Sequence, residues 1–300
     1  RSLTLPLLRR FSTVGHRGPL VSTTWLSERI ESSKLSIVDG SWFLPSHGRD
    51  PRAEFKERRL PGAVYFDLDV VSDTSSSLPH MLPGVETMAA WLRDHGVDPA
   101  NDVVVYDGLG VFSAPRVWWM LRHFGLTHVH VLDGGFPKWQ AEGLPIETTP
   151  VAPTPLPSLP QLSLHDSYKV IRMAQVKENI SSDEFTLVDA RPAGRFRGDE
   201  PEPRPIPSGH IPNSLNLPFS QLINPDGTFK STEDLAAVLT ATGVDVDKPT
   251  VVGCGSGVAA CVVGMAVELV GGEPPALYDG SWTEWATNNQ PIATSSSENN

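Results

Sequence analysis

Cysteine is scarce in this sequence, and so is positive charge. Only two cysteines, Cys254 and Cys261, occur in 300 residues, whereas a secreted disulfide scaffold carries many more in a shorter chain. We therefore expect free thiols and a reducing compartment. Lysine and arginine number 24 against 35 acidic residues, giving a formal net charge of -11. A general nucleic-acid binder needs a basic face, so this balance argues against direct nucleic-acid binding.

Long apolar runs are also missing. We find no uninterrupted apolar stretch of the ~18 residues that a membrane-spanning helix needs, so the sequence predicts a soluble protein with no membrane role. Hydrophobic residues make up 39% of the chain and charged residues 20%, as in an ordinary globular protein. A length of 300 residues suits two domains of ~100–200 residues each.

The first 18 residues differ in composition from the rest. They include four arginines and several hydroxyl residues, and no acidic residue occurs before Glu28. An arginine-rich, acid-poor start is typical of a mitochondrial transit peptide, although a disordered basic terminus can have the same composition. We expect residues 1–18 to be a mitochondrial targeting segment, and a cytoplasmic pool is left open.

A proline-rich stretch divides the chain near its midpoint. It contains the string ETTPVAPTPLPSLPQL, and proline cannot donate to a β-ladder and favours extended backbone. Residues 147–163 are therefore predicted to be a semi-rigid linker. It would join a domain at 19–146 to a second domain at 164–292, with a disordered tail at 293–300.

Short strings recur in the same order on the two sides of this linker. VVVYDG (103–108) corresponds to TVVGCG (250–255), and VLDGGFPKW (131–139) corresponds to LYDGSWTEW (277–285). The chain is therefore predicted to contain a duplicated domain.

Each copy alternates short β-branched runs with segments compatible with helices. In the second copy LVDA, SLNLP, TVVG and ALYDG predict strands, and residues near 231–242 and 258–270 have helical apolar spacing. This alternation predicts the α/β class, with two tandem domains that each contain a mostly parallel sheet flanked by helices. Functional groups of such sheets gather at the carboxyl ends of the strands.

Cys254 lies at such a strand end. The strand predicted at 250–253 leads into the loop Cys-Gly-Ser-Gly-Val-Ala (254–259), and a predicted helix follows. Two glycines let the loop curl and turn successive N–H groups toward one point, and a helix N-terminus favours an anion there. A cysteine held in this loop is expected to be ionised and nucleophilic near neutral pH. The alternative is a buried structural cysteine.

The string CGSGVAAC (254–261) resembles the active-site loop of mercaptopyruvate sulfurtransferases in the rhodanese superfamily, usually written CG(S/T)GVTAC. Thiosulfate-preferring rhodaneses generally carry a charged CRKGVT-type loop instead. Ala259 replaces the usual Thr, a departure that could weaken a hydrogen bond in the loop. The resemblance runs roughly from Leu20 to Ile292 and includes SAPRVWWM (113–120), GRFRG (194–198), EPEPR (200–204), GHIP (209–212) and YDGSW (278–282). It implies two tandem rhodanese-like domains and sulfur transfer through Cys254.

The resemblance also implies a proton relay in which Ser256 joins His80 and Asp69. In such a relay the carboxylate orients the imidazole and the imidazole polarises the hydroxyl. Each residue alone also has a structural interpretation, because Asp69 shares the string FDLD with Asp67 and His80 lies in the plain loop LPHMLPG.

Arg195 and Arg204 resemble the substrate arginines of the family. Mercaptopyruvate carries a carboxylate beside a ketone, and guanidinium groups offer paired planar donors to such oxygens. The neighbouring Arg191 and Arg197 are interpreted as structural or surface charges. Four residues of the loop are also expected to contact the substrate: Gly255, Gly257, Val258 and Ala259.

Asp107 occupies the position in the first copy that corresponds to Cys254. A carboxylate cannot accept a transferable sulfur, so the first domain is predicted to be catalytically silent and to form one wall of a cleft. Cys261 is interpreted as a small buried residue and not as a resolving thiol. Five tryptophans are expected to pack in the core and not to form a base-stacking surface: Trp118, Trp119, Trp139, Trp282 and Trp285.

The predicted reaction begins when the Cys254 thiolate attacks the sulfur of 3-mercaptopyruvate, which releases pyruvate and leaves a persulfide. The acceptor stays open among thioredoxin, a small thiol, cyanide and a sulfur-carrier protein for tRNA thiolation. One alternative is a thiosulfate:cyanide sulfurtransferase that uses thiosulfate as donor. Another is a non-catalytic binding module with the same fold.

Other chemistries are disfavoured. Phosphatases of a related fold grip phosphate with an arginine at the position that Ala260 occupies here. We predict no metal site, because neither cysteine nor the histidines show paired ligand spacing. No nucleotide cofactor is predicted, because a phosphate-binding fingerprint is missing.

Overall fold

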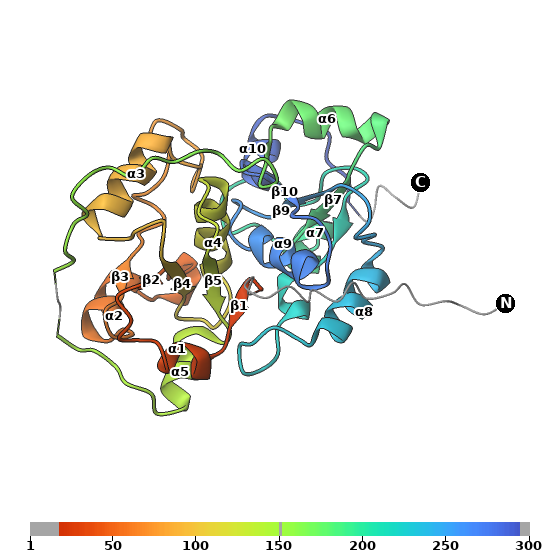
Figure 1. The fold of residues 1–300 in the computed structure, drawn as a ribbon. Helices are drawn as coiled ribbons and strands as arrows, with labels where there is room; N and C mark the ends of the chain where they lie inside the picture. Colours follow the sequence, from red (N-terminus) through yellow and green to blue (C-terminus); the bar gives the residue numbers. More distant parts are fainter. Residues whose placement is uncertain (1–17, 150–151, 295–300) are drawn as a thin grey trace.

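The computed structural model describes residues 18–149 and 152–294. Over these residues the chain forms two α/β halves that lie side by side, the first coloured red to yellow-green and the second green to blue in Figure 1. Most of the expected targeting segment (1–17) and the end of the expected tail (295–300) lie outside the described residues.

Each half contains one five-stranded sheet, and both sheets have the same topology. In the first the order is β1 (Leu20–Val21), β5 (Val129–Leu132), β4 (Asp102–Tyr106), β2 (Leu35–Asp39), β3 (Val64–Tyr65). In the second it is β6 (Val170–Ile171), β10 (Ala276–Tyr278), β9 (Thr250–Gly253), β7 (Thr186–Asp189), β8 (Leu215–Asn216). All neighbouring strands within each sheet are parallel. The predicted fold class and the duplication are both confirmed.

The central strands β4 and β9 are buried along nearly their whole length because helices cover both faces of each sheet. Val103, Val104 and Val105 of β4 have no exposed surface, as the β-branched run in the sequence predicts. In the first half the helices are α1 (Thr23–Ser27), α2 (Pro51–Glu57), α3 (Val85–Asp94), α4 (Ala114–His123) and α5 (Gly135–Ala141). In the second they are α6 (Met173–Ser182), α7 (Ala193–Arg197), α8 (Thr232–Thr242), α9 (Ala260–Leu269) and α10 (Ser281–Thr287). Two short 3-10 helices cover Pro45–His47 and Phe219–Leu222. Within the described parts of the chain, none of the helices has the length and apolar character required to cross a bilayer.

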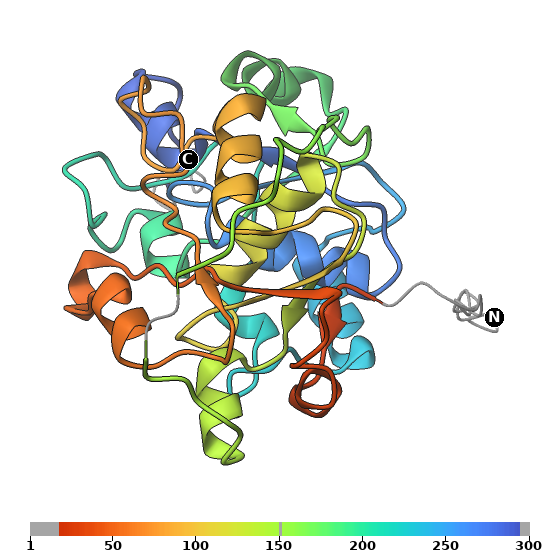
Figure 2. The ribbon, with the colours of Figure 1, turned by 60° about the vertical axis from the view of Figure 1, so that its left-hand side comes forward.

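Helices α4 and α9 pack against each other where the two halves meet, and Figures 1 and 2 show them in the middle of the molecule. Helix α9 is apolar on nearly every side, because its own sheet covers one face and α4 covers another. Each of these helices directly follows the central strand that ends in the functional loop of its half. The five tryptophans expected in the core are all buried, as predicted.

The helix predicted at 258–270 begins two residues later than expected, at Ala260. The N–H of Cys261 donates to the carbonyl of Val258 (3.2 Å), and the N–H of Val262 donates to that of Ala259 (3.1 Å). Each bond joins residues three positions apart, as in a 3-10 helix, so the first turn is tighter than an α-helix. The loop between β9 and α9 is therefore longer than the sequence pattern predicts.

Residues 152–163 of the proline-rich stretch are extended and lie against the first half. Figure 1 shows this segment passing outside α3 before the chain enters the second half. The N–H of Leu156 donates to the carbonyl of Arg93 (2.8 Å), and that of His165 donates to the carbonyl of His123 (2.8 Å). These bonds tie the segment to the ends of α3 and α4. The exact domain boundaries at 146 and 164 stay a prediction.

Candidate active site

Cys254 follows β9, and the start of α10 holds its main chain. The hydroxyl of Ser281 accepts the N–H of Cys254 (3.2 Å), and the N–H of Trp282 donates to the Cys254 carbonyl (2.9 Å). The carbonyl of Gly255 accepts from Thr283 twice, from its N–H (3.0 Å) and from its hydroxyl (2.6 Å). Both carbonyls at the start of the loop are therefore fixed toward α10. Because C=O and N–H point in opposite directions in a trans peptide, the N–H groups that follow turn the other way, into the loop.

The corresponding loop of the first half shows what such N–H groups do. Asp107 stands in the place of Cys254, and a left-handed glycine follows in each loop, Gly110 at φ 108° and Gly257 at φ 76°. The Asp107 carboxylate accepts hydrogen bonds of 2.8–2.9 Å from the N–H groups of Leu109, Phe112, Ser113 and Ala114. The loop geometry thus holds an anion in the first half. In the second half the N–H groups at the positions of Leu109, Phe112 and Ser113 are those of Ser256, Ala259 and Ala260.

The structure brings Asp69, His80 and Ser256 together in one hydrogen-bonded chain. His80 Nδ1 lies 2.9 Å from Ser256 Oγ, and His80 Nε2 lies 3.0 Å from Asp69 Oδ1. The indole of Trp42 meets the His80 ring edge-on at 4.6 Å and donates to Asp69 Oδ2 (3.1 Å). Three residues predicted from both halves of the sequence therefore meet at one place.

The contacts of His80 set its tautomer. An ionised carboxylate only accepts hydrogen bonds, so Nε2 carries the proton that faces Asp69. In the neutral ring Nδ1 is then free to accept the hydroxyl proton of Ser256. The hydrogen bond from His80 holds the pKa of Asp69 below its ordinary value, and the positive charge of Arg204 acts in the same direction. The carboxylate therefore stays ionised and keeps the imidazole oriented.

Arg195 and Arg204 both reach the loop at Gly255. A Cβ placed on Gly255 would lie 3.3 Å from Arg195 Nη2 and 4.0 Å from Arg204 Nη1. Any side chain at this position would therefore press on the guanidinium group of Arg195. Glu202 holds Arg195 from behind and also accepts from Arg191 (2.8 Å).

The two other arginines of this region differ from Arg195 and Arg204. Arg191 is buried and pairs with Asp189 (2.6 Å), whereas the side chain of Arg197 is 50% exposed and pairs with Asp199 (2.7 Å). These contacts fit the structural and surface roles that the sequence predicts for them.

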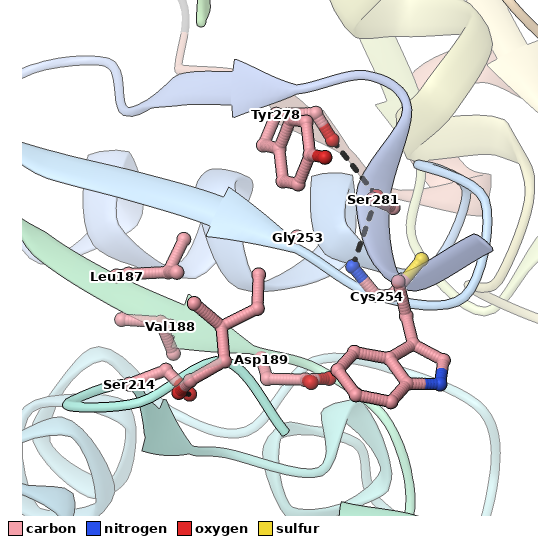
Figure 3. A pocket seen from close by; sticks show the side chains of 10 residues that line it. Leu187, Val188, Asp189, Ser214, Gly253, Cys254, Tyr278 and Ser281 are labelled. Carbon is pink, nitrogen blue, oxygen red and sulfur yellow. Dashed lines mark hydrogen bonds between the residues drawn. The ribbon is translucent and has the colours of Figure 1, made fainter. Parts of the chain in front are cut away.

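Cys254 is more enclosed than the sequence analysis anticipates for a nucleophile, since only 5% of the residue is exposed. Behind its backbone lies a cavity of about 10 Å³, lined partly by Leu187, Val188, Asp189 and Tyr278. Figure 3 shows that the sulfur points away from these residues. Such a volume corresponds to about one water molecule, so this cavity does not hold a substrate. The side of the loop at Gly255, where the arginines lie, is partly exposed.

A larger hollow of about 540 Å³ lies between the halves, but it is beside the silent loop. Leu109 of that loop and Lys138 of α5 line it from the first half, and Ile223 and Asp226 line it from the second. Cys254 is not among its lining residues. The larger hollow therefore lies beside the Asp107 loop and not beside the Cys254 loop.

Several residues at the site are missed by the sequence analysis. Glu202 pairs with Arg195, and Asp279 pairs with Arg116. Thr283 donates to the carbonyl of Gly255. A signal is present for Arg116, because it is the one charged residue in the otherwise apolar string SAPRVWWM (113–120), and a buried cation requires a partner.

Cys261 is buried, as predicted. Burial raises the pKa of its thiol to about 12, and the thiol donates to the carbonyl of Gly257 (3.5 Å). The group is therefore a neutral thiol near pH 7. In the described parts of the chain, no cluster of three or more His, Cys, Asp or Glu side chains is arranged to hold a metal ion.

Known proteins share this architecture. The rhodanese-like domain family matches residues 22–142 and 172–288. The chain is 44% identical over 273 residues to 3-mercaptopyruvate sulfurtransferase of Homo sapiens, covering 89% of this chain and 91% of that protein. It is 43% identical over 276 residues to thiosulfate sulfurtransferase of Mus musculus, with coverages of 89% and 91%.

A solved structure agrees with these matches. The sulfur transferase subunit of yeast mitochondrial complex I, present there in sub-stoichiometric amount, superposes with a TM-score of 0.84 at 35% identity. The superposition covers 92% of this chain and 99% of that one. The two matched domains, the relatives aligned along most of their length and the shared three-dimensional architecture show that this chain belongs to the rhodanese family of sulfurtransferases.

Proposed function

We propose that this protein transfers sulfur from 3-mercaptopyruvate to an acceptor through a persulfide on Cys254 and releases pyruvate. The main support is the convergence at one loop of the cysteine, two arginines and the Asp69–His80–Ser256 chain. The human relative that bears the name of this activity adds to that support.

The arginines suit the carboxylate and ketone of the donor. Arg195 Nη2 and Arg204 Nη1 both face Gly255, and a carboxylate placed between them would accept charged hydrogen bonds from both. Glu202 keeps the Arg195 fork in place. The donor sulfur would then point toward Cys254.

The reaction needs one proton to move. The Cys254 thiolate attacks the donor sulfur, an S–S bond forms, and the C–S electrons pass to the methylene carbon as the enolate of pyruvate. The thiol proton of the donor must leave the sulfur, and the enolate carbon must gain a proton. Ser256 can pass that proton to and from His80 while Asp69 stabilises the charged ring. The arginines lower the energy of the enolate.

Thiosulfate is the second candidate donor. It is favoured by the murine relative named thiosulfate sulfurtransferase, which is about as similar to this chain as the human one. However, Gly255, Ser256 and Gly257 bring no positive charge to the loop, and a dianion would be better served by Arg or Lys there. Mercaptopyruvate is therefore the preferred donor in this proposal.

We further propose a mitochondrial location, with a thiol, cyanide or a protein as the sulfur acceptor. The yeast structural relative belongs to a mitochondrial complex, and the basic composition of residues 1–18 agrees with import. Thioredoxin, a small thiol, cyanide and a sulfur-carrier protein are the acceptors to compare.

The test measures turnover of the purified protein on mercaptopyruvate and on thiosulfate. In parallel, mass spectrometry of the peptide containing Cys254 looks for one added sulfur atom, and a Cys254→Ser variant provides the control. We expect faster turnover on mercaptopyruvate and a persulfide on Cys254. A preference for thiosulfate would overturn the donor, and an unmodified peptide with both donors would overturn the enzymatic role.

A further inference from the structure

Arg116 is a fully buried cation that connects the two halves of the site. It comes from α4 of the first half and has no exposed surface. Its Nη2 donates to the backbone carbonyl of His80 (2.6 Å) and to Asp279 Oδ1 (2.7 Å), and its Nη1 reaches the carbonyl of Gly257 (3.5 Å). One guanidinium group thus contacts the segment that carries the relay histidine and the loop that carries the nucleophile.

His80 needs an external support for its backbone. It has φ 61°, a left-handed conformation that costs a non-glycine residue roughly 1–2 kcal/mol, and it lies outside any helix or strand. Arg116 holds its carbonyl, and Asp279 Oδ2 accepts the N–H of Leu82 just beyond it (2.8 Å). The Arg116–Asp279 pair therefore grips the turn at His80 from both sides.

The same pair also touches the loop of the second half. A Cβ on Gly257 would lie 3.1 Å from Arg116 Nη1 and 3.1 Å from the Asp279 carbonyl. The guanidinium group therefore packs directly on the left-handed residue that shapes the loop after Ser256. Asp279 itself follows β10 and precedes the residues that fix the carbonyls of Cys254 and Gly255.

From these contacts we propose that Arg116 is a positioning residue that sets His80 of the first half in register with Ser256 of the second. This inference rests on the function proposed above. It assigns the alignment of His80 with Ser256 to Arg116, a residue outside the relay. His80 Nδ1 meets Ser256 Oγ at 2.9 Å only while the two halves keep one relative placement. The planar guanidinium group of an arginine can donate to several groups at fixed angles, whereas the ammonium group of a lysine acts as a point charge.

The pair is not explained by stability alone. Replacing a buried ion pair by apolar side chains is often neutral or stabilising, so its presence at this interface is better explained by geometry than by free energy of folding. A purely structural role would lower the amount of folded protein. A positioning role would lower kcat in every folded molecule.

The experiment compares Arg116→Met in two backgrounds, the wild type and Ser256→Ala, with mercaptopyruvate as donor and rates normalised to titratable Cys254 thiol. In the wild-type background we expect kcat to fall ~10- to 100-fold, as for a misplaced catalytic group, with KM changed less than ~3-fold because the arginines of the substrate site are untouched. In the Ser256→Ala background the same substitution should lower kcat less than ~3-fold, because the relay it positions is already broken.

Arg59→Met is the matched control. Arg59 is also buried, and it pairs with Glu147 and bonds the carbonyls of Phe55 and Thr149, all in the first half of the sequence. We expect its kcat per titrated thiol to stay within ~2-fold of the wild type. Equal losses for Arg116→Met in both backgrounds, or a kcat no lower than that of the control, would overturn the proposal.

Two further measurements keep the test decisive. If Arg116→Met does not fold, Arg116→Lys replaces it, because lysine keeps the positive charge but lacks the planar guanidinium group. The kcat of this variant is then compared between the two backgrounds and with the Arg59→Met control. In parallel, the persulfide on Cys254 is measured in the wild-type protein after treatment with mercaptopyruvate. Its absence would overturn the proposed function and the role of Arg116 together, whereas a normal persulfide with equal losses in both backgrounds would overturn only the role of Arg116.

Discussion

His80 Nδ1 lies 2.9 Å from Ser256 Oγ, although the two residues are 176 positions apart and belong to different domains. Both residues are almost completely buried, with exposed fractions of 4% for His80 and 6% for Ser256. Neither domain alone holds a complete relay. The proposed proton transfer at Cys254 therefore depends on the interface between the two copies.

His80→Asn should abolish most of the activity while leaving donor binding intact. The amide can fill the space of the ring but cannot take up and return a proton, so kcat for mercaptopyruvate should fall ~10²- to 10⁴-fold. Steady-state kinetics measure the effect, with His47→Asn as the control because His47 is exposed. A His80→Asn variant with near wild-type kcat would remove the relay from the mechanism.

Arg195→Lys and Arg204→Lys should raise KM more than they lower kcat. A charged hydrogen bond of this kind contributes about 1.5–3 kcal/mol, which corresponds to a ~10- to 100-fold change in affinity. Arg197→Lys is the control, because Arg197 is half exposed and pairs with Asp199 away from the loop. Equal KM values for all three variants would argue against a carboxylate clamp at Gly255.

Asp107→Asn should destabilise the protein without changing the chemistry at Cys254. The Asp107 carboxylate accepts hydrogen bonds from four N–H groups, three of which are buried. An amide would turn an NH₂ group toward some of them, at a cost of about 1–3 kcal/mol. Chemical denaturation measures the loss, and kcat per titrated Cys254 thiol should stay unchanged. A large fall in kcat would mean that the loop around Asp107 contributes to the reaction at Cys254.

Glu268→Gln should stabilise the protein more at pH 8 than at pH 4.5. Burial raises the pKa of Glu268 from 4.5 to about 7, against the opposing effects of the hydrogen bond from Tyr168 and the charge of Arg122. Between pH 4.5 and about pH 7, the two pKa values, the folded state keeps a proton that the unfolded state has lost. The free energy of unfolding of the wild type therefore falls as pH rises through this range. Above about pH 7 both states are ionised and the penalty is complete.

The glutamine variant lacks this penalty. Its advantage over the wild type should grow by on the order of 1–3 kcal/mol between pH 4.5 and pH 8. Denaturation curves across this range measure the difference, and Glu184→Gln is the control because Glu184 is exposed and does not contribute to the pKa of Glu268. Parallel stability profiles for Glu268→Gln and the wild type would contradict the prediction.

The order of strands and helices could be predicted because its signals are local. The β-branched run before Cys254 became β9, and the segment near 231–242 became α8, which begins after Ser231 caps the N–H of Asp234 (3.1 Å). The repeat predicted from matching strings appears as two sheets of identical topology. Helix α9 begins two residues later than the apolar spacing predicts, because that spacing does not reveal the tight turn at Val258.

The sequence by itself determined the duplicated α/β domains and the loop around Cys254. Strand patterns, glycines and a recurring order of strings depend on neighbouring residues, so they can be interpreted without coordinates. Tertiary structure alone decided that Arg116 of one copy would grip His80 and Asp279, and that Cys254 would be largely enclosed. Those outcomes depend on how the sheets and helices of the two halves pack against each other. A local sequence pattern does not predict the distance between residues that meet only across that interface.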